Sequence, residues 1–180
     1  MTTHRLLLVP CIVALGLLGI ACSIEQALPP PSCLGGGSEL IVAQSVPTAT
    51  LVPCLGPLPD GWEVASVRVD QNGSVVRLDS DRAGTDAARL VFDRQCDITD
   101  AVQVPSDQSG VPAYEAIGRI QPGFLGARTY TFDGGCVRWE FDFDHNVSAT
   151  LAIDLQTRLT LVLRSEINRS IRENFIDEEL

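Results

Sequence analysis

Three carboxylates recur at every second position late in the chain: Glu140, Asp142 and Asp144. In an extended strand, residues two apart point to the same side and lie about 7 Å apart, a spacing at which paired carboxylates can cleave glycosides. The row is therefore the candidate catalytic set of a carboxylate-dependent hydrolase acting on cell-wall glycan. A row of like charges is also typical of a solvated face or of a protected sheet edge, and we favour that interpretation.

A second acidic segment begins with Asp79 and Asp81 and has a glycine, Gly84, at its sixth position, as a calcium-binding loop does. The twelfth position of such a loop requires a bidentate glutamate, and Leu90 stands there. Carboxylates in a turn also accept local backbone hydrogen bonds, which explains the spacing without a metal ion. We therefore expect no stoichiometric calcium or zinc, and Asp79 and Asp81 remain the only metal candidates.

The residue types that most enzymes need are scarce. Apart from His4 in the first few residues, His145 is the only histidine, and all 13 basic residues are arginine. One histidine does not make a multi-histidine zinc site, and a chain without lysine lacks Schiff-base chemistry and a phosphate-loop lysine. An exposed turn is the simpler interpretation of His145. We expect no cofactor and no enzymatic activity.

Cys22 ends a segment that resembles an export signal. A short, weakly basic start precedes an apolar run over residues 6–20, and small residues stand just before Cys22. The run has about 15 residues, short of the roughly 20 that cross a bilayer as a helix. We predict that residues 1–21 are a cleaved signal peptide and that Cys22 carries a lipid, although Gly19 stands where such signals usually have leucine. A secreted protein with one spare thiol and an uncleaved anchor are the alternatives.

Residues 22–38 are rich in proline and glycine, which is typical of a tether. Residues 39–180 then form a single domain, because a chain of this length can bury one core. A lipid anchor would hold this domain on the extracytoplasmic side of the cell membrane. The formal net charge of −10 argues against nucleic acid. The expected partners are the membrane, through the lipid, and an envelope protein or glycan.

Four cysteines remain once the signal is removed and Cys22 is lipidated: Cys33, Cys54, Cys96 and Cys136. Exported domains with an even set are normally oxidised, and four cysteines allow three connectivities. We predict a Cys96–Cys136 disulfide because both residues lie at the ends of expected strands, where a bridge does not distort the sheet. Cys33 would then pair with Cys54 and fasten the tether to the domain. Pairing of Cys54 with Cys136 or with Cys96 remains open.

The middle of the chain predicts antiparallel strands. Asn72-Gly73 is a strong hairpin signal between two β-prone runs, and residues 133–135 form a second expected hairpin loop. The strands are expected over residues 62–70, 74–78, 88–92, 113–120, 127–132 and 136–143. The last of these alternates between apolar and charged residues, which predicts one face on a core and one face toward water or a ligand. The Pro-punctuated segment before them is expected to lie across the domain, with Leu51 and Val52 buried.

After Asn146 the period changes to that of a helix. The apolar residues Val147, Leu151, Leu155, Leu159, Val162 and Leu163 follow helical spacing. Asn146 would cap this helix, and a second helix could restart at Ser165. Strands followed by helices predict an α+β fold: an antiparallel β-sheet with C-terminal helices packed on one face.

Four aromatic residues in the expected strands raise the question of a sugar- or peptide-binding patch: Trp62, Tyr114, Tyr130 and Trp139. Aromatic side chains in strands belong more often to the core. We favour the core interpretation for these four residues.

Three segments together resemble exported lipoproteins and membrane-anchored proteins of high-GC Gram-positive bacteria. They are residues 45–49 (Ser-Val-Pro-Thr-Ala) with Pro53-Cys54, residues 78–84, and residues 132–137 (Phe-Asp-Gly-Gly-Cys-Val). The likeness spans most of residues 45–165 and implies an exported location and a single domain, without an activity. The resulting expectation is a membrane-anchored extracytoplasmic lipoprotein domain with a binding or envelope role.

Overall fold

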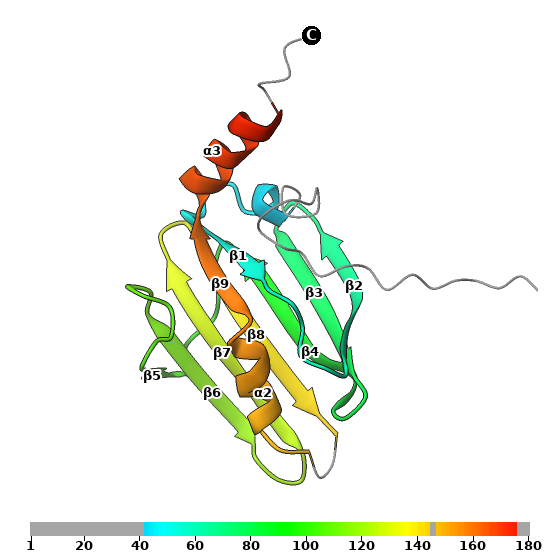
Figure 1. The fold of residues 1–180 in the computed structure, drawn as a ribbon. Coiled ribbons are helices and arrows are strands. Elements are labelled where there is room, and N and C mark those ends of the chain that lie inside the picture. Colours follow the sequence, from blue (N-terminus) through cyan, green and yellow to red (C-terminus); the bar gives the residue numbers. More distant parts are fainter. Residues whose placement is uncertain (1–41, 145–146, 176–180) are drawn as a thin grey trace, which may run out of the picture.

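The structure is a computed structural model that describes residues 42–144 and 147–175. Its main element is an antiparallel sheet. The strands of this sheet are β2 (Trp62–Val69), β3 (Gly73–Ser80), β4 (Gly84–Asp93), β5 (Val102–Val104), β6 (Ala113–Arg119), β7 (Phe124–Phe132) and β8 (Gly135–Phe143). They are ordered β2-β3-β4-β8-β7-β6-β5, so that β2 and β5 form the two edges (Figure 1). The predicted antiparallel sheet is confirmed.

Two tight hairpins follow the turn signals of the sequence. At the β2–β3 turn, the Asp70 carboxylate accepts the Asn72 backbone N–H at 2.9 Å, and β3 begins at Gly73, one residue before the expected start. At the β7–β8 turn, Phe132 pairs directly with Gly135, so the loop has two residues rather than the predicted three. Gly134 has a φ of 75°, and a Cβ there would lie 1.9 Å from the Thr48 carbonyl oxygen. Only glycine therefore allows this turn to sit against the N-terminal segment.

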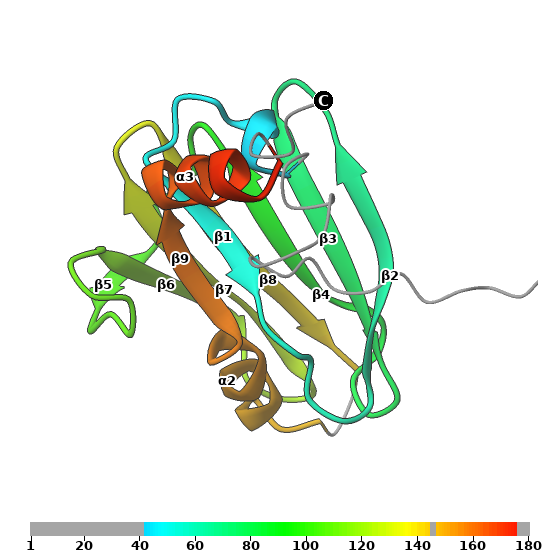
Figure 2. The ribbon, with the colours of Figure 1, turned by 45° about the horizontal axis from the view of Figure 1, so that its top comes forward.

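A second, two-stranded sheet covers one face of the main sheet. It consists of β1 (Leu51–Leu55) and β9 (Leu159–Leu163), which pair antiparallel. The helix α2 (Thr150–Gln156) lies beside them on the same face, as the two ribbon views show (Figures 1 and 2). No described helix or strand lies on the opposite face. We call the two sides of the main sheet the covered face and the open face.

The predicted helix through Leu159 and Val162 is wrong. The helix α2 ends at Gln156, and the chain continues as the strand β9. The run Leu-Thr-Leu-Val-Leu fits a period of two as well as a helical one: Leu159 and Leu161 face the main core, whereas Val162 packs with Val52 on the other side. Pairing with β1 over five residue pairs decides between the two periods.

Of the two remaining helical predictions, the second helix is found and the cap cannot be compared with the structure. The helix α3 (Arg164–Phe175) begins close to the expected restart at Ser165, and Ile167 is buried in it. The predicted cap Asn146 lies outside the described residues, and Ala149, which precedes α2, makes no side-chain cap hydrogen bond. Helices are few and short, so the fold is predominantly antiparallel β. The expected layer of C-terminal helices is largely replaced by β1 and β9.

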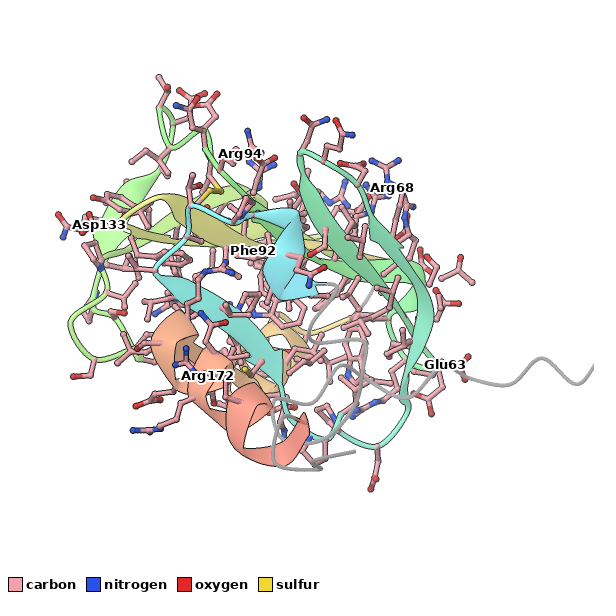
Figure 3. The ribbon with its side chains drawn as sticks, turned by 90° about the horizontal axis from the view of Figure 1, so that it is seen from above. Glu63, Arg68, Phe92, Arg94, Asp133 and Arg172 are labelled. Carbon is pink, nitrogen blue, oxygen red and sulfur yellow. A yellow bond between two sulfur atoms is a disulfide. The ribbon has the colours of Figure 1, made fainter. Side chains whose placement is uncertain are left out.

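Aromatic side chains fill the space between the main sheet and the β1–β9 layer. The largest fully buried ones include Tyr130, Trp139, Phe92, Phe141 and Phe143. Figure 3 looks at the molecule from above, with Phe92 in the interior and Asp133 and Arg172 at the periphery. Fully burying one such side chain stabilises a fold by roughly 1.5–3 kcal/mol. This core gives β8 the buried face that its alternation predicts.

The segment before β1 is fixed to the domain by hydrogen bonds. The Arg164 guanidinium donates to the backbone carbonyls of Val46 and Ala49, at 2.6 and 2.5 Å. Burial lowers the pKa of Arg164. Residues 42–45 form a short helical turn. Val52 is buried as predicted, whereas Leu51 is half-buried.

Candidate functional site

The carboxylate row of β8 lies on the open face of the sheet. Because side chains alternate along a strand, burial of Trp139, Phe141 and Phe143 sends Glu140 and Asp142 to the other side. Asp144 directly follows β8 with the same parity, and it is exposed. The structure therefore brings the three predicted carboxylates to one surface.

This surface is hollowed into a groove of about 620 Å³. Its lining includes small residues of β6 and β7, namely Ala116, Gly118, Gly126 and Ala127. Longer side chains of β4 and β8, among them Arg89 and Glu140, line it as well. The groove forms because small residues stand beside long ones on neighbouring strands. We call this hollow the open-face groove.

Arginines neutralise most of the carboxylates in the open-face groove. Glu140 pairs with Arg138 at 2.6 Å, and Asp142 pairs with Arg119 at 3.2 Å, with the Asp142 side chain 70% exposed. No arginine forms an ion pair with Asp144 among the described residues. A general acid in a glycosidase needs a carboxyl group that is kept protonated by burial. The ion pairs of Glu140 and Asp142 and the exposure of Asp142 do not provide that buried environment.

Asp86 is the best-connected carboxylate of the groove. It pairs with Arg77 at 2.8 Å and with Arg89 in a closer contact. The hydrogen bond from Arg89 is the largest cause that lowers the pKa of Asp86, and it outweighs the opposing effect of partial burial. Asp86 also has a φ of 53°, a conformation that Asp adopts more readily than most residues. No pattern in the sequence points to this position.

The two metal candidates, Asp79 and Asp81, form local contacts at the β3–β4 turn. The Asp79 carboxylate accepts the Asp86 backbone N–H at 2.6 Å, and Asp81 pairs with Arg82 at 3.6 Å. The Ser80 hydroxyl accepts backbone N–H groups within the same turn. Within the described residues, no group of three or more His, Cys, Asp and Glu side chains is arranged to hold a metal ion. His145 lies outside the described residues.

The predicted Cys96–Cys136 disulfide is confirmed, with the two Cα atoms 6.0 Å apart. By strand alternation, Cys136 shares the side of β8 that carries Glu140, so the bridge fastens the 94–101 loop to the open face. Cys54 is also disulfide-bonded. Its predicted partner Cys33 lies outside the described residues, as does the lipidation candidate Cys22, so both of those predictions remain untested.

A buried polar cluster on the covered face was not predicted. Arg128, whose side chain is 11% exposed, pairs with Glu115 at 2.5 Å and with Asp107 at 2.8 Å. It also donates to the Tyr130 hydroxyl at 2.9 Å, and that hydroxyl donates to Asp107 at 2.9 Å. The side chain of Gln108 extends the cluster to the backbone of β9. We call this set the Arg128 cluster.

The surroundings in the Arg128 cluster shift the pKa values of the Tyr130 phenol and the Asp107 carboxylate. Burial, followed by the Asp107 carboxylate, raises the pKa of Tyr130, so this phenol stays neutral. Burial alone would raise the pKa of Asp107, but hydrogen bonds from Gln108, Tyr130 and Arg128 hold it below its usual value. Such a satisfied network holds a structure in place. The aromatic-patch hypothesis fails for Trp62, Tyr130 and Trp139, which belong to the core, and Tyr114 is half-buried.

No described helix is long and apolar enough to cross a membrane. No protein family, curated protein or solved structure matches this chain.

Proposed function

We propose that this chain is an exported, lipid-anchored domain that binds an envelope component in the open-face groove without catalysing a reaction. The observation that carries the proposal is the state of the groove carboxylates. Glu140 and Asp142 are ion-paired and solvated, which suits the recognition of a charged or polar ligand and does not suit proton transfer.

The exported location is supported by the sequence and by the disulfide chemistry. An apolar segment that ends at Cys22 and a Pro/Gly-rich stretch after it match a lipoprotein signal followed by a tether. Disulfides such as Cys96–Cys136 persist mainly in oxidising compartments. The resemblance to exported lipoproteins of high-GC Gram-positive bacteria points the same way.

The anchor is tested by replacing Cys22 with alanine in the full chain. We expect loss of label from a radioactive fatty acid and release of the protein from the membrane fraction. Retention in the membrane with no label in either protein would favour an uncleaved anchor instead.

Groove binding is tested by photo-crosslinking in the native envelope. A photoreactive residue at Leu125, which lines the groove and is 40% exposed, should give a discrete adduct. The matched control position is Leu163, which is 49% exposed and lies on β9 in the other layer. Equal adducts at both positions, or none at Leu125, would contradict binding in the groove.

One observation keeps the hydrolase alternative in view: Glu140, Asp142 and Asp144 all line the same groove. Purified protein incubated with cell-wall glycan should release no soluble fragments. Release that is abolished by Glu140→Gln or Asp142→Asn would replace the binding proposal with a carboxylate-dependent hydrolase.

A further inference from the structure

The second half of β6 has an outer edge with no strand beside it. The short strand β5 pairs only with Ala113–Glu115, through three residue pairs. On its other side, β6 stays paired with β7 as far as Arg119. Among the described residues, none pairs with the outer edge of 116–119, as the lower half of β6 in Figure 1 shows. Such an edge presents unpaired backbone N–H and C=O groups that can template another strand.

Exposed apolar side chains gather at this edge. Ile117 is 57% exposed, Ile120 is 63% exposed and Val102, at the start of β5, is 70% exposed. These are three of the six large hydrophobic side chains that are exposed in the described residues. Natural edge strands are usually protected by charged side chains or proline. Apart from the charged Arg119, this edge offers aliphatic surface. A register shift between Ile117 and Arg119 limits an added strand to a short segment.

The open-face groove reaches the same edge. Ala116 and Gly118 belong to its lining, whereas Ile117, between them, points to the other side of the sheet by strand alternation. Four carboxylates and one guanidinium line the groove. Arginines pair with three of these carboxylates, and Asp144 alone forms no ion pair among the described residues. A strand added to β6 would place alternate side chains toward these carboxylates and against aliphatic side chains.

We propose that the free edge of β6 binds an extended peptide segment of an envelope protein, in which basic and aliphatic side chains alternate. The segment adds as a strand beside residues 116–119, with basic side chains toward the groove and aliphatic ones toward Ile117 and Ile120. This proposal rests on the proposed groove function and names its ligand class. The formal charge of −10 favours a basic segment over a second copy of the chain.

The test uses the full chain in detergent and three blocked synthetic peptides of about seven residues, the length of a typical strand. In the first, lysine and valine alternate. The second has the same composition in two blocks, and the third is the alternating peptide N-methylated at every second backbone amide. We expect the alternating peptide to bind at least about tenfold more tightly than either control, because only it combines side-chain alternation with backbone pairing. Hydrogen exchange should slow at the amides of 116–119.

Two variants test whether the peptide binds at the free edge of β6. Ile117→Lys should weaken binding of the alternating peptide about tenfold, because it puts a charge where an aliphatic side chain of the added strand would lie. Leu163→Lys, which alters a similarly exposed leucine in another layer, should leave the affinity unchanged. Because the Ile117 side chain is more than half exposed, its replacement should preserve the fold, which circular dichroism checks.

Two results would overturn the edge proposal. One is equal affinity for the N-methylated and unmodified peptides, and the other is unchanged affinity in Ile117→Lys. In either case an adduct from Leu125 in the envelope would still support binding in the groove, so the two proposals fail separately. If the alternating peptide does not bind and the 116–119 amides stay unprotected, the edge proposal also fails.

Discussion

Two loops on either side of the short strand β5 are held in different ways. The 94–101 loop, which enters β5, is fastened by the Cys96–Cys136 disulfide. The 105–112 loop, which leaves β5, is fastened by Asp107 and Gln108 of the Arg128 cluster. Both loops are largely exposed and contribute few side chains to the core. A loop with few apolar contacts is thus held by a covalent bond or by a satisfied polar network, and these two kinds of attachment respond to different conditions.

The largest loss of stability should come from removing the Cys96–Cys136 disulfide. The double variant Cys96→Ala with Cys136→Ala opens a loop whose ends are 40 residues apart. The chain-entropy relation gives a loss of about 4 kcal/mol in the free energy of unfolding. Urea denaturation of the variant and the oxidised parent measures it. A loss below about 1 kcal/mol would mean that the disulfide does not act through chain entropy.

Removing the central cation of the Arg128 cluster should reduce the free energy of unfolding somewhat less than removing the disulfide does. Arg128→Met leaves Asp107 and Glu115 without their partner, and we expect a loss of about 3 kcal/mol, at the lower end for buried pairs because both carboxylates are partly exposed. The control is Arg68→Met, whose side chain is 75% exposed and should change stability by less than about 0.5 kcal/mol. Similar losses in the two variants would contradict a structural role for the cluster.

Lowering the pH should weaken the polar attachment of the 105–112 loop and leave the disulfide of the 94–101 loop unaffected. Asp107 has a lower pKa in the folded chain than in the unfolded chain. Its contribution to stability is therefore complete above the unfolded value of about 3.9 and is lost as pH falls through the lowered folded value. Asp107→Asn should flatten the fall in stability below about pH 4, whereas the cysteine double variant should retain it. Denaturation midpoints measured between neutral pH and acid test this, and an unchanged acid slope in Asp107→Asn would contradict it.

The smallest effect should come from an exposed ion pair in the groove. The Arg89 and Asp86 side chains are 40% and 33% exposed. Arg89→Met should therefore reduce the free energy of unfolding by less than about 1 kcal/mol. Added salt should shrink the difference further. A loss as large as that of Arg128→Met would show that the groove charges hold the fold together rather than remain available to a ligand.

What the sequence predicted correctly depends on local patterns. The alternation in β8 and the Asn72-Gly73 turn are readable within a few residues, and both are confirmed. The Cys96–Cys136 pair followed from its position at strand ends. The groove carboxylates were found because strand alternation places Glu140 and Asp142 together.

What the sequence did not predict depends on distant partners. The run in β9 has no local feature that separates a strand from a helix, and its partner β1 lies far away in the chain. The Arg128 cluster joins the 105–112 loop to the three strands β6, β7 and β9, whose proximity only the folded sheet creates. The groove itself arises from small residues such as Ala116 and Ala127 next to long ones on other strands. None of these contacts leaves a periodic signal.

The pairing of β1 with β9 also determines the order in which the domain can be completed. Leu51 pairs with Leu163, so one strand of this layer is synthesised early and the other near the end of the chain, roughly a hundred residues later. Closing a contact over that separation is entropically costly until the main sheet has brought the two strands together. Until β9 has been synthesised, β1 therefore lacks its partner strand, and Val52 and Leu55 lack the contacts that bury them in the finished domain. The β1–β9 layer is therefore completed last, and β9 ends the interval in which β1 is unpaired.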